Sequence, residues 1–382
     1  MAFLDKLYGN PNAVGIDIGS HSIKIVQLTP VRNGFALLRA GSAPTPPGAI
    51  KQGVVDDRLA VAEAIDTLMH TLGITTPWAV AAVSAPTVVV RQVRLPAMPE
   101  HQLRKSIYWE ARNYITFPVE DSLVEFQILG TTSVDGTPQM DVMLVASPRE
   151  LVDSRTETME QAGLEPLAIE LEPFALMRVA IDLPHGGAGT NETVALVSIG
   201  ATYTHISIIA GGTFVLFRSV TVAGNSFTEA IATGMGIDTA QAEEIKENEA
   251  QAVTDEMERA KLSPVGQEAS RAMEAVLEEL VREIRRSFAF YDYQQIPGGA
   301  PRGSEGITRI YVTGGGSNLP GLIPFLAEQI SIPVEGVQLF DNYLIQLPAG
   351  AESIVSQTPL LTTAFGLALR EPMLARMKGG SR

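Results

Sequence analysis

The feature that constrains this chain most is a short motif that occurs twice, 181 residues apart. In each copy an apolar strand runs into a glycine turn: the copies read Gly15-Ile16-Asp17-Ile18-Gly19-Ser20 and Leu196-Val197-Ser198-Ile199-Gly200-Ala201. Apolar residues alternate again after both turns, which is typical of a β-hairpin. The repeat indicates an internally duplicated chain. A length of 382 residues agrees, because one hydrophobic core rarely grows beyond about 250–300 residues.

The remaining sequence predicts two lobes of α/β structure. The Gly-rich segment 183–193 places the boundary between a lobe of residues 1–186 and a lobe of residues 187–382. Apolar spacing predicts helices at 59–72, from Pro99, from Ser147 to Gly163, from Asp238 and at 264–294. Strands are predicted within 14–28 and at 79–83, 87–95, 123–130, 140–146, 194–199, 204–210, 213–219 and 307–312. Ser147 and Glu150 are expected to form a capping box, and Leu59 is expected to face inward.

Composition excludes several classes of function. The chain has no cysteine, so it has no disulfide, thiolate zinc site or cysteine nucleophile. Its net charge of −15 opposes binding to nucleic acid or to anionic lipid. Five scattered histidines do not form a metal cage, and no long uncharged apolar stretch or signal sequence occurs. We therefore expect a cytoplasmic protein without direct membrane insertion.

The two glycine turns predict a binding site for a nucleotide. Glycine turns expose backbone N–H groups and allow close approach to phosphate oxygens, so two hairpins facing one cleft can hold a triphosphate. Asp17 is positioned to hold Mg²⁺ through water, and Lys24 to neutralise phosphate charge. The segment Thr313-Gly314-Gly315-Gly316-Ser317-Asn318 adds a third glycine-rich strand end. The alternative is that each Gly-Ser turn only joins a hairpin.

These segments resemble the signatures of the actin, Hsp70 and sugar-kinase superfamily. Residues 14–26 are similar to its first phosphate motif, 194–208 to its second, 310–322 to its adenosine motif and 360–370 to its second connecting motif. The best candidate for the first connecting motif is Glu170-Leu171-Glu172-Pro173-Phe174-Ala175-Leu176. The resemblance implies an actin-like (ribonuclease H-like) two-lobed α/β fold with a nucleotide cleft.

Within that superfamily the chain is most similar to the PilM family of type IV pilus assembly. The segments that carry the similarity are 93–99 and 106–120, which resemble an inserted subdomain called 1C, and 242–246, which resembles a helix that contacts adenosine. This implies subdomain 1A with a 1C-like insertion at about 30–162, and subdomain 2A with a subdomain 2B at about 224–300. It also implies a groove between 1A and 1C for the N-terminal cytoplasmic peptide of the inner-membrane protein PilN. The protein is then peripheral to the inner membrane through PilN and contacts other pilus assembly components.

The resemblance also assigns site residues. ATP or ADP with Mg²⁺ is the expected cofactor, Asp17 the expected contact to the metal, and Glu172 the candidate for a catalytic role. The cofactor-binding candidates are Asp17, Gly19, Ser20, His21, Ser22, Lys24, Gly200, Ala201, Thr202, Glu243, Lys246, Gly314, Gly315, Gly316 and Asn318. Trp109 and Phe117 either line the peptide groove or belong to the core.

One departure from the superfamily pattern bears on catalysis. The second phosphate motif usually has an aspartate before its glycine turn, whereas this chain has Ser198. A hydroxyl brings no charge to position Mg²⁺-bound water, so slow hydrolysis or none is expected. The alternatives to an adaptor are an active ATPase or small-molecule kinase, a filament-forming protein like FtsA, and the equivalent component of type II secretion. A homo-oligomer is compatible with the sequence.

Overall fold

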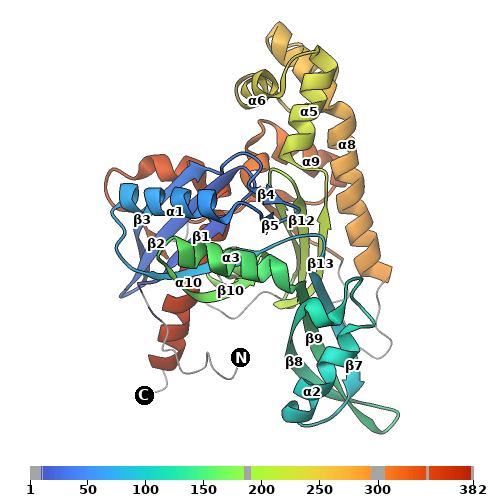
Figure 1. The fold of residues 1–382 in the computed structure, drawn as a ribbon. Helices are drawn as coiled ribbons and strands as arrows, with labels where there is room; N and C mark the ends of the chain where they lie inside the picture. The colour runs from blue at the N-terminus through green and yellow to red at the C-terminus, as the bar shows by residue number, and fades with distance from the viewer. Residues whose placement is uncertain (1–9, 11, 185–190, 294–305, 341–343, 380–382) are drawn as a thin grey trace.

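The computed structural model describes residue 10 and residues 12–184, 191–293, 306–340 and 344–379. Its main elements are two large β-sheets with helices packed on them, and a smaller sheet next to the second of these (Figure 1). The predicted linker 183–193 falls largely outside the described residues, and the first strand after it begins at Thr193. Among the helices of the described ranges, none contains a hydrophobic stretch that could span a lipid bilayer.

The first large sheet has the strand order β10-β6-β1-β2-β3-β16. Strands β1, β2 and β3 form an antiparallel meander, whereas β6 and β10 continue the sheet in parallel. Helices α1 and α3 cover the face that carries Ile16, and α10 covers the face that carries Gly15. The bounds are β1 Val14–Ile18, β2 Ser22–Val31, β3 Gly34–Pro44, β6 Trp78–Val83, β10 Glu165–Leu171, β16 Ile345–Gln346, α1 Arg58–Leu72, α3 Arg149–Gln161 and α10 Thr358–Gly379.

The second large sheet repeats this topology. Its order is β13-β12-β11-β14-β15, again an antiparallel meander followed by two parallel strands. The internal duplication that the paired glycine motifs predict is therefore present in the topology. The bounds are β11 Thr193–Ile199, β12 Thr204–Ala210, β13 Thr213–Val220, β14 Arg309–Thr313, β15 Val334–Gly336, α5 Gly224–Met235, α6 Thr239–Asn248, α7 Glu256–Arg259, α8 Pro264–Tyr293 and α9 Leu322–Ile330.

The small sheet has the strand order β7-β9-β8, and its strands lie between β6 and α3 in the sequence. Helix α2 packs on it around Leu103 and Ile107. It lies beside the C-terminal end of α8, where Arg91 stacks over the ring of Phe290 at 5.7 Å (Figure 1). The bounds are β7 Val89–Pro96, β8 Ser122–Val134, β9 Thr137–Pro148 and α2 Glu100–Ala111. Because β3 and β6 belong to the first large sheet, we propose that the insertion is narrower than 30–162, at about residues 84–148.

The end of the chain returns to the first sheet. Strand β16 pairs with β3, and α10 packs on β1 and on α4 (Glu172–Met177). The approach is close: a Cβ on Gly15 would lie 2.2 Å from the carbonyl oxygen of Ala364, and one on Gly366 would lie 2.1 Å from that of Ala175. We propose a lobe boundary near residue 187, although residues 345–379 pack against the first lobe.

The local predictions had mixed outcomes. The helix predicted at 264–294 is confirmed as α8, and Met273, Leu280 and Ile284 on its inner face are all inaccessible. Two predictions were wrong. Pro148 is the N-cap of α3, without a capping bond from a side chain, and Ser147 Oγ donates to the carbonyl of Pro148 instead. Leu59 is 63% exposed, because Val61, Ala62 and Ile65 form the buried face of α1 instead.

Candidate functional site

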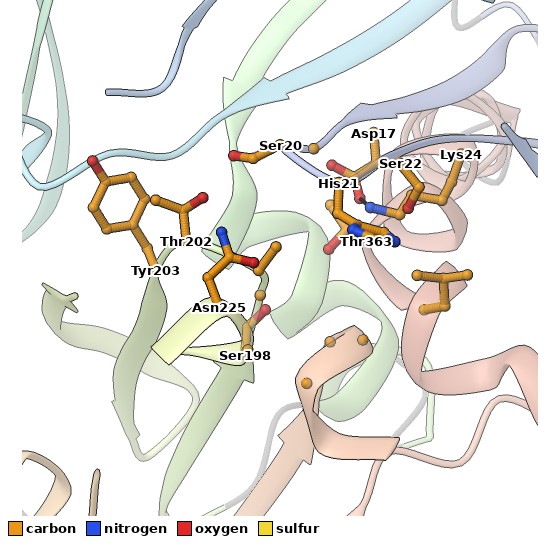
Figure 2. A pocket seen from close by; sticks show the side chains of 18 of the residues that line it. Asp17, Ser20, His21, Ser22, Lys24, Ser198, Thr202, Tyr203, Asn225 and Thr363 are labelled. Atoms are coloured by element: carbon orange, nitrogen blue, oxygen red, sulfur yellow. Dashed lines mark ion pairs between the residues drawn. The ribbon is translucent and has the colours of Figure 1, made fainter. Parts of the chain in front are cut away.

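A cavity of about 610 Å³ opens between the two large sheets. Its size is that of a small-molecule or cofactor site. Figure 2 shows Asp17, Ser22 and Lys24 on one side of it and Ser198, Thr202 and Asn225 on the other. All the predicted site residues line this one cavity: Asp17, Gly19, Ser20, His21, Ser22, Lys24, Glu172, Gly200, Ala201, Thr202, Glu243, Lys246, Gly314, Gly315, Gly316 and Asn318. Their roles stay predictions, but their convergence is a property of the structure.

The two glycine turns are built alike. Gly19 N–H donates to the carbonyl of Ser22 at 3.1 Å, and Gly200 N–H donates to that of Tyr203 at 2.9 Å. The flanking strands pair in the same register, with Ile18 opposite Ile23 and Ile199 opposite Thr204. The repeated sequence therefore makes the same tight turn at the same strand end of each sheet, and both turns face the cavity.

The third glycine-rich segment, Gly314–Gly316, lies directly against the end of β11. A Cβ on Gly314 would lie 2.4 Å from the carbonyl oxygen of Ile199, and one on Gly316 would lie 2.6 Å from the Cγ2 of Ile199. Gly314 also has φ 88° and ψ 156°, a region almost closed to other residues. The glycines are needed because a side chain would separate this turn from the Gly200 turn.

Lys24 and Asp17 form an ion pair on the first-lobe side. The two residues are directly opposite in the β1–β2 register, and Lys24 Nζ lies 3.1 Å from Asp17 Oδ2. Lys24 Nζ also lies 2.7 Å from where a Cβ on Gly19 would stand, so the ammonium group is beside the turn. Next to it, Ser22 Oγ is buried with no hydrogen-bond partner among the described residues.

Glu172 lies at the start of α4 and faces both Ser198 and His205 of the second lobe. Ser198 Oγ donates to Glu172 Oε1 at 2.9 Å, and His205 Nε2 is 3.6 Å from Glu172 Oε2. Burial lowers the pKa of His205, although the charges of Glu172 and Asp17 oppose this, so the imidazole is neutral near pH 7. Its Nδ1 lies 2.8 Å from Ser219 Oγ. These contacts hold one carboxylate at the interface of the lobes.

Glu243 and Lys246 project from α6 on the opposite side. Lys246 Nζ lies 2.7 Å from both carboxylate oxygens of Glu243 and 2.9 Å from Thr228 Oγ1. Burial raises the pKa of Glu243, but hydrogen bonds from Lys246 and Thr228 outweigh it, and the pKa lies below its ordinary value. Glu243 is therefore ionised at neutral pH. An ionised carboxylate accepts stronger hydrogen bonds from hydroxyl groups than a neutral carboxyl does.

Sequence reasoning missed several lining residues, among them His205, Arg155 and Asn225. The repeat contained the signal for His205. Just as Lys24 is paired with Asp17 across the first hairpin, His205 is paired with Ser198 across the second. Arg155 was detectable from spacing, because it lies four residues from both Leu151 and Met159 on the buried face of α3. Asn225 follows a loop and had no local signal.

The lining fits a nucleotide carrying phosphates. It offers two exposed glycine turns, a lysine, a buried arginine, and a buried serine hydroxyl with an unused donor. The described residues contain no group of three metal-ligating side chains, so Mg²⁺ would depend on Asp17, water and the phosphates themselves.

Solved structures share this architecture. The chain superposes on a PilM–PilN type IV pilus biogenesis complex with a TM-score of 0.79 and 28% identity, over 94% of this chain and 98% of the other. It superposes on MreB5 of Spiroplasma citri bound to AMPPNP with a TM-score of 0.54 and 11% identity, over 98% and 99% of the two chains. These likenesses confirm the actin-like fold expected from the sequence.

Sequence comparison agrees with the structural likeness. The chain is 23% identical to the cell division protein FtsA of Bacillus subtilis (strain 168) over 252 residues, which cover 62% of this chain and 51% of FtsA. It thus matches only about half the length of that relative. The model of the family described as type IV pilus assembly protein PilM matches residues 15–372. The chain therefore belongs to the type IV pilus assembly protein PilM family.

Proposed function

We propose that this protein is an ATP-binding adaptor of the inner-membrane platform for type IV pilus assembly. It binds nucleotide in the cavity between the sheets, and it binds the N-terminal cytoplasmic peptide of PilN. The observation that carries the proposal is the pair of equivalent turns, at Gly19 and Gly200, that face one cavity from opposite lobes. The likeness to the PilM–PilN complex supports the choice of partner.

The cavity divides into a phosphate end and an adenosine end. The turns at Gly19–Ser22 and Gly200–Thr202, together with Lys24, would hold the phosphates, and Asp17 would hold Mg²⁺ through water. Gly314–Asn318 and the pair Glu243–Lys246 would hold the adenosine. A bound nucleotide would contact both lobes. It would therefore favour a form with the lobes closed around it over a form with the lobes apart, by the difference between its binding free energies for the two forms.

The insertion layer is the proposed place of PilN binding. Trp109 on α2 is 57% exposed, so of its two alternatives the core does not apply. Its ring meets Tyr108 edge-on at 5.4 Å and is covered by Arg112 at 4.5 Å, which holds it in place on the surface. Rigid exposed aromatic residues beside arginine are frequent anchors of peptide interfaces. The partner then holds the protein at the cytoplasmic side of the inner membrane.

Calorimetric titration tests both binding functions. ATP with Mg²⁺ and a PilN N-terminal peptide are added separately and together. We expect heat from each, and Trp109→Ala should weaken the peptide at least about tenfold while leaving ATP affinity unchanged. Met257→Ala, which truncates an exposed side chain on α7 in the second lobe, is the control. If neither ligand produces heat on titration, the proposal is contradicted.

Hydrolysis is expected to be slow, because Ser198 gives its hydroxyl hydrogen to Glu172 and contributes no second carboxylate. Ser198→Asp should raise phosphate release by about 10- to 100-fold with Mg²⁺ and ATP, since a charged group can then orient metal-bound water. It should also lower the melting temperature without ligand, because two carboxylates then lie together. Ser198→Asn is the uncharged control, and an equal rate in the two variants would contradict this account.

A further inference from the structure

Arg155 is a buried cation that lines the cavity. The residue is 4% exposed. Its Nη1 donates to the carbonyl of Gly53 at 2.6 Å and to that of Leu151 at 3.2 Å. Its Nε is also buried, and it has no hydrogen-bond partner within the described part of the chain. A guanidinium in this position has donors that the protein itself does not use.

No described carboxylate lies within 4.0 Å of the Arg155 guanidinium. Burial lowers the pKa of Arg155 to about 10, and the charges of Asp17 and Glu172 raise it. The side chain therefore stays cationic near pH 7. A buried cation without a paired anion is unfavourable, so the site favours an anion that arrives from the cavity.

Two unused hydroxyl groups accompany Arg155. Ser84 follows β6 and Ser22 begins β2; the Oγ atoms of both are buried without a partner among the residues described, and both residues line the same cavity. The backbone carbonyl oxygen of Ser84 lies 3.3 Å from where a Cβ on Gly53 would stand, so Ser84 lies beside the residue whose carbonyl accepts from Arg155. Three first-lobe groups with unused hydrogen-bonding capacity thus line one cavity.

The position of these groups selects one part of the nucleotide. Glu243 and Lys246 mark the adenosine end, whereas Asp17 and Glu172, the carboxylates whose charges act on Arg155, belong to the phosphate end. In the proposed arrangement, a chain of phosphates that starts at the adenosine end would bring its last member to Asp17 and Glu172. Arginine is suited to that contact, because its planar guanidinium can donate two parallel hydrogen bonds to a phosphoryl group.

We propose that the Arg155 guanidinium binds the terminal phosphoryl group of a nucleoside triphosphate, and that the cleft thereby distinguishes the triphosphate from the diphosphate. This inference rests on the proposed nucleotide binding and deepens it. Arg155 is then the residue through which the first lobe responds to the presence of the third phosphate.

The test is the ratio of dissociation constants for ADP and for a non-hydrolysable ATP analogue, both measured by calorimetry with Mg²⁺. In the unsubstituted protein the analogue should bind about 10- to 100-fold more tightly than ADP. In Arg155→Gln the ratio should approach one, with ADP affinity changed by less than about twofold. Arg155→Lys keeps the charge and should retain part of the preference, and it serves if the glutamine variant does not fold.

Arg58→Gln is the matched control. Arg58 holds α3 from outside the cavity through ion pairs with Glu150 and Glu157, so its loss disturbs the same helix without touching the ligand. The ratio should stay unchanged in this variant. A ratio that also stays unchanged in Arg155→Gln, or equal losses for both nucleotides, would overturn the proposal.

Two further outcomes separate this inference from the proposed function. If the unsubstituted protein binds neither nucleotide, nucleotide binding itself fails. If it binds both equally, only the role of Arg155 fails. A third arm adds inorganic phosphate to ADP: if phosphate tightens ADP binding while the triphosphate analogue has no advantage, Arg155 binds a free anion and the proposal is wrong.

Discussion

Gly314→Ala is expected to destabilise the folded protein by about 3 kcal/mol or more and to abolish measurable ATP binding. The glycine has φ 88° and ψ 156°, a conformation nearly restricted to glycine. The new Cβ would also lie 2.4 Å from the carbonyl oxygen of Ile199 and 2.8 Å from its nitrogen. Ile199 and residue 314 cannot easily move apart, because β11 and β14 pair in parallel and Gly314 N–H donates to the carbonyl of Pro359.

Urea unfolding and calorimetric titration with ATP measure the two effects. Gly236→Ala is the control, because Gly236 also has a positive φ, 67°, but a Cβ there would meet nothing within 4 Å. That change should cost about 1 kcal/mol and leave ATP binding intact. Equal losses of stability in the two variants would show that the contact with Ile199 is unimportant.

Lys24→Met is expected to weaken ATP by about 10- to 100-fold, since a hydrogen bond to a charged group contributes about 1.5–3 kcal/mol. The ammonium group stands beside the Gly19 turn and faces the cavity. Its loss also leaves Asp17 without its ion-pair partner, which places an uncompensated negative charge next to the phosphates. Methionine keeps the apolar stem, so packing between the strands is preserved.

Calorimetry gives the change in ATP affinity, and Lys51→Met is the matched control. Lys51 also pairs with an aspartate, Asp56, at 2.5 Å, but both side chains are exposed and neither lines the cavity. The control should bind ATP as the unsubstituted protein does. If Lys24→Met binds equally well, the first turn does not hold the phosphates.

The duplicated fold was predictable because its signal was local and repeated. The same sequence pattern produced the same turn at Gly19 and at Gly200, and the two topologically equivalent sheets follow from it. The packing of α10 against the first sheet was harder to predict from the sequence. It depends on close approaches at Gly15 and Gly366, between segments that lie far apart in the sequence.

The site was predictable where a residue belonged to a motif, and it was missed where position alone gives a residue its role. The spacing of Arg155 from Leu151 and Met159 puts it on the inner face of α3, but only the packing of that helix shows that this face meets the cavity. Trp109 looks like a core residue because its size favours burial, yet Leu103 and Ile107 occupy the inward face of α2. In both cases tertiary packing decides which side of a helix is covered.

A crystal structure of the protein with a non-hydrolysable ATP analogue and Mg²⁺ tests the central claim most directly. The account predicts the triphosphate between the turns at Gly19 and Gly200, with adenosine between Gly314–Asn318 and the pair Glu243–Lys246. Nucleotide bound elsewhere, or an empty cavity at a saturating analogue concentration, would contradict it.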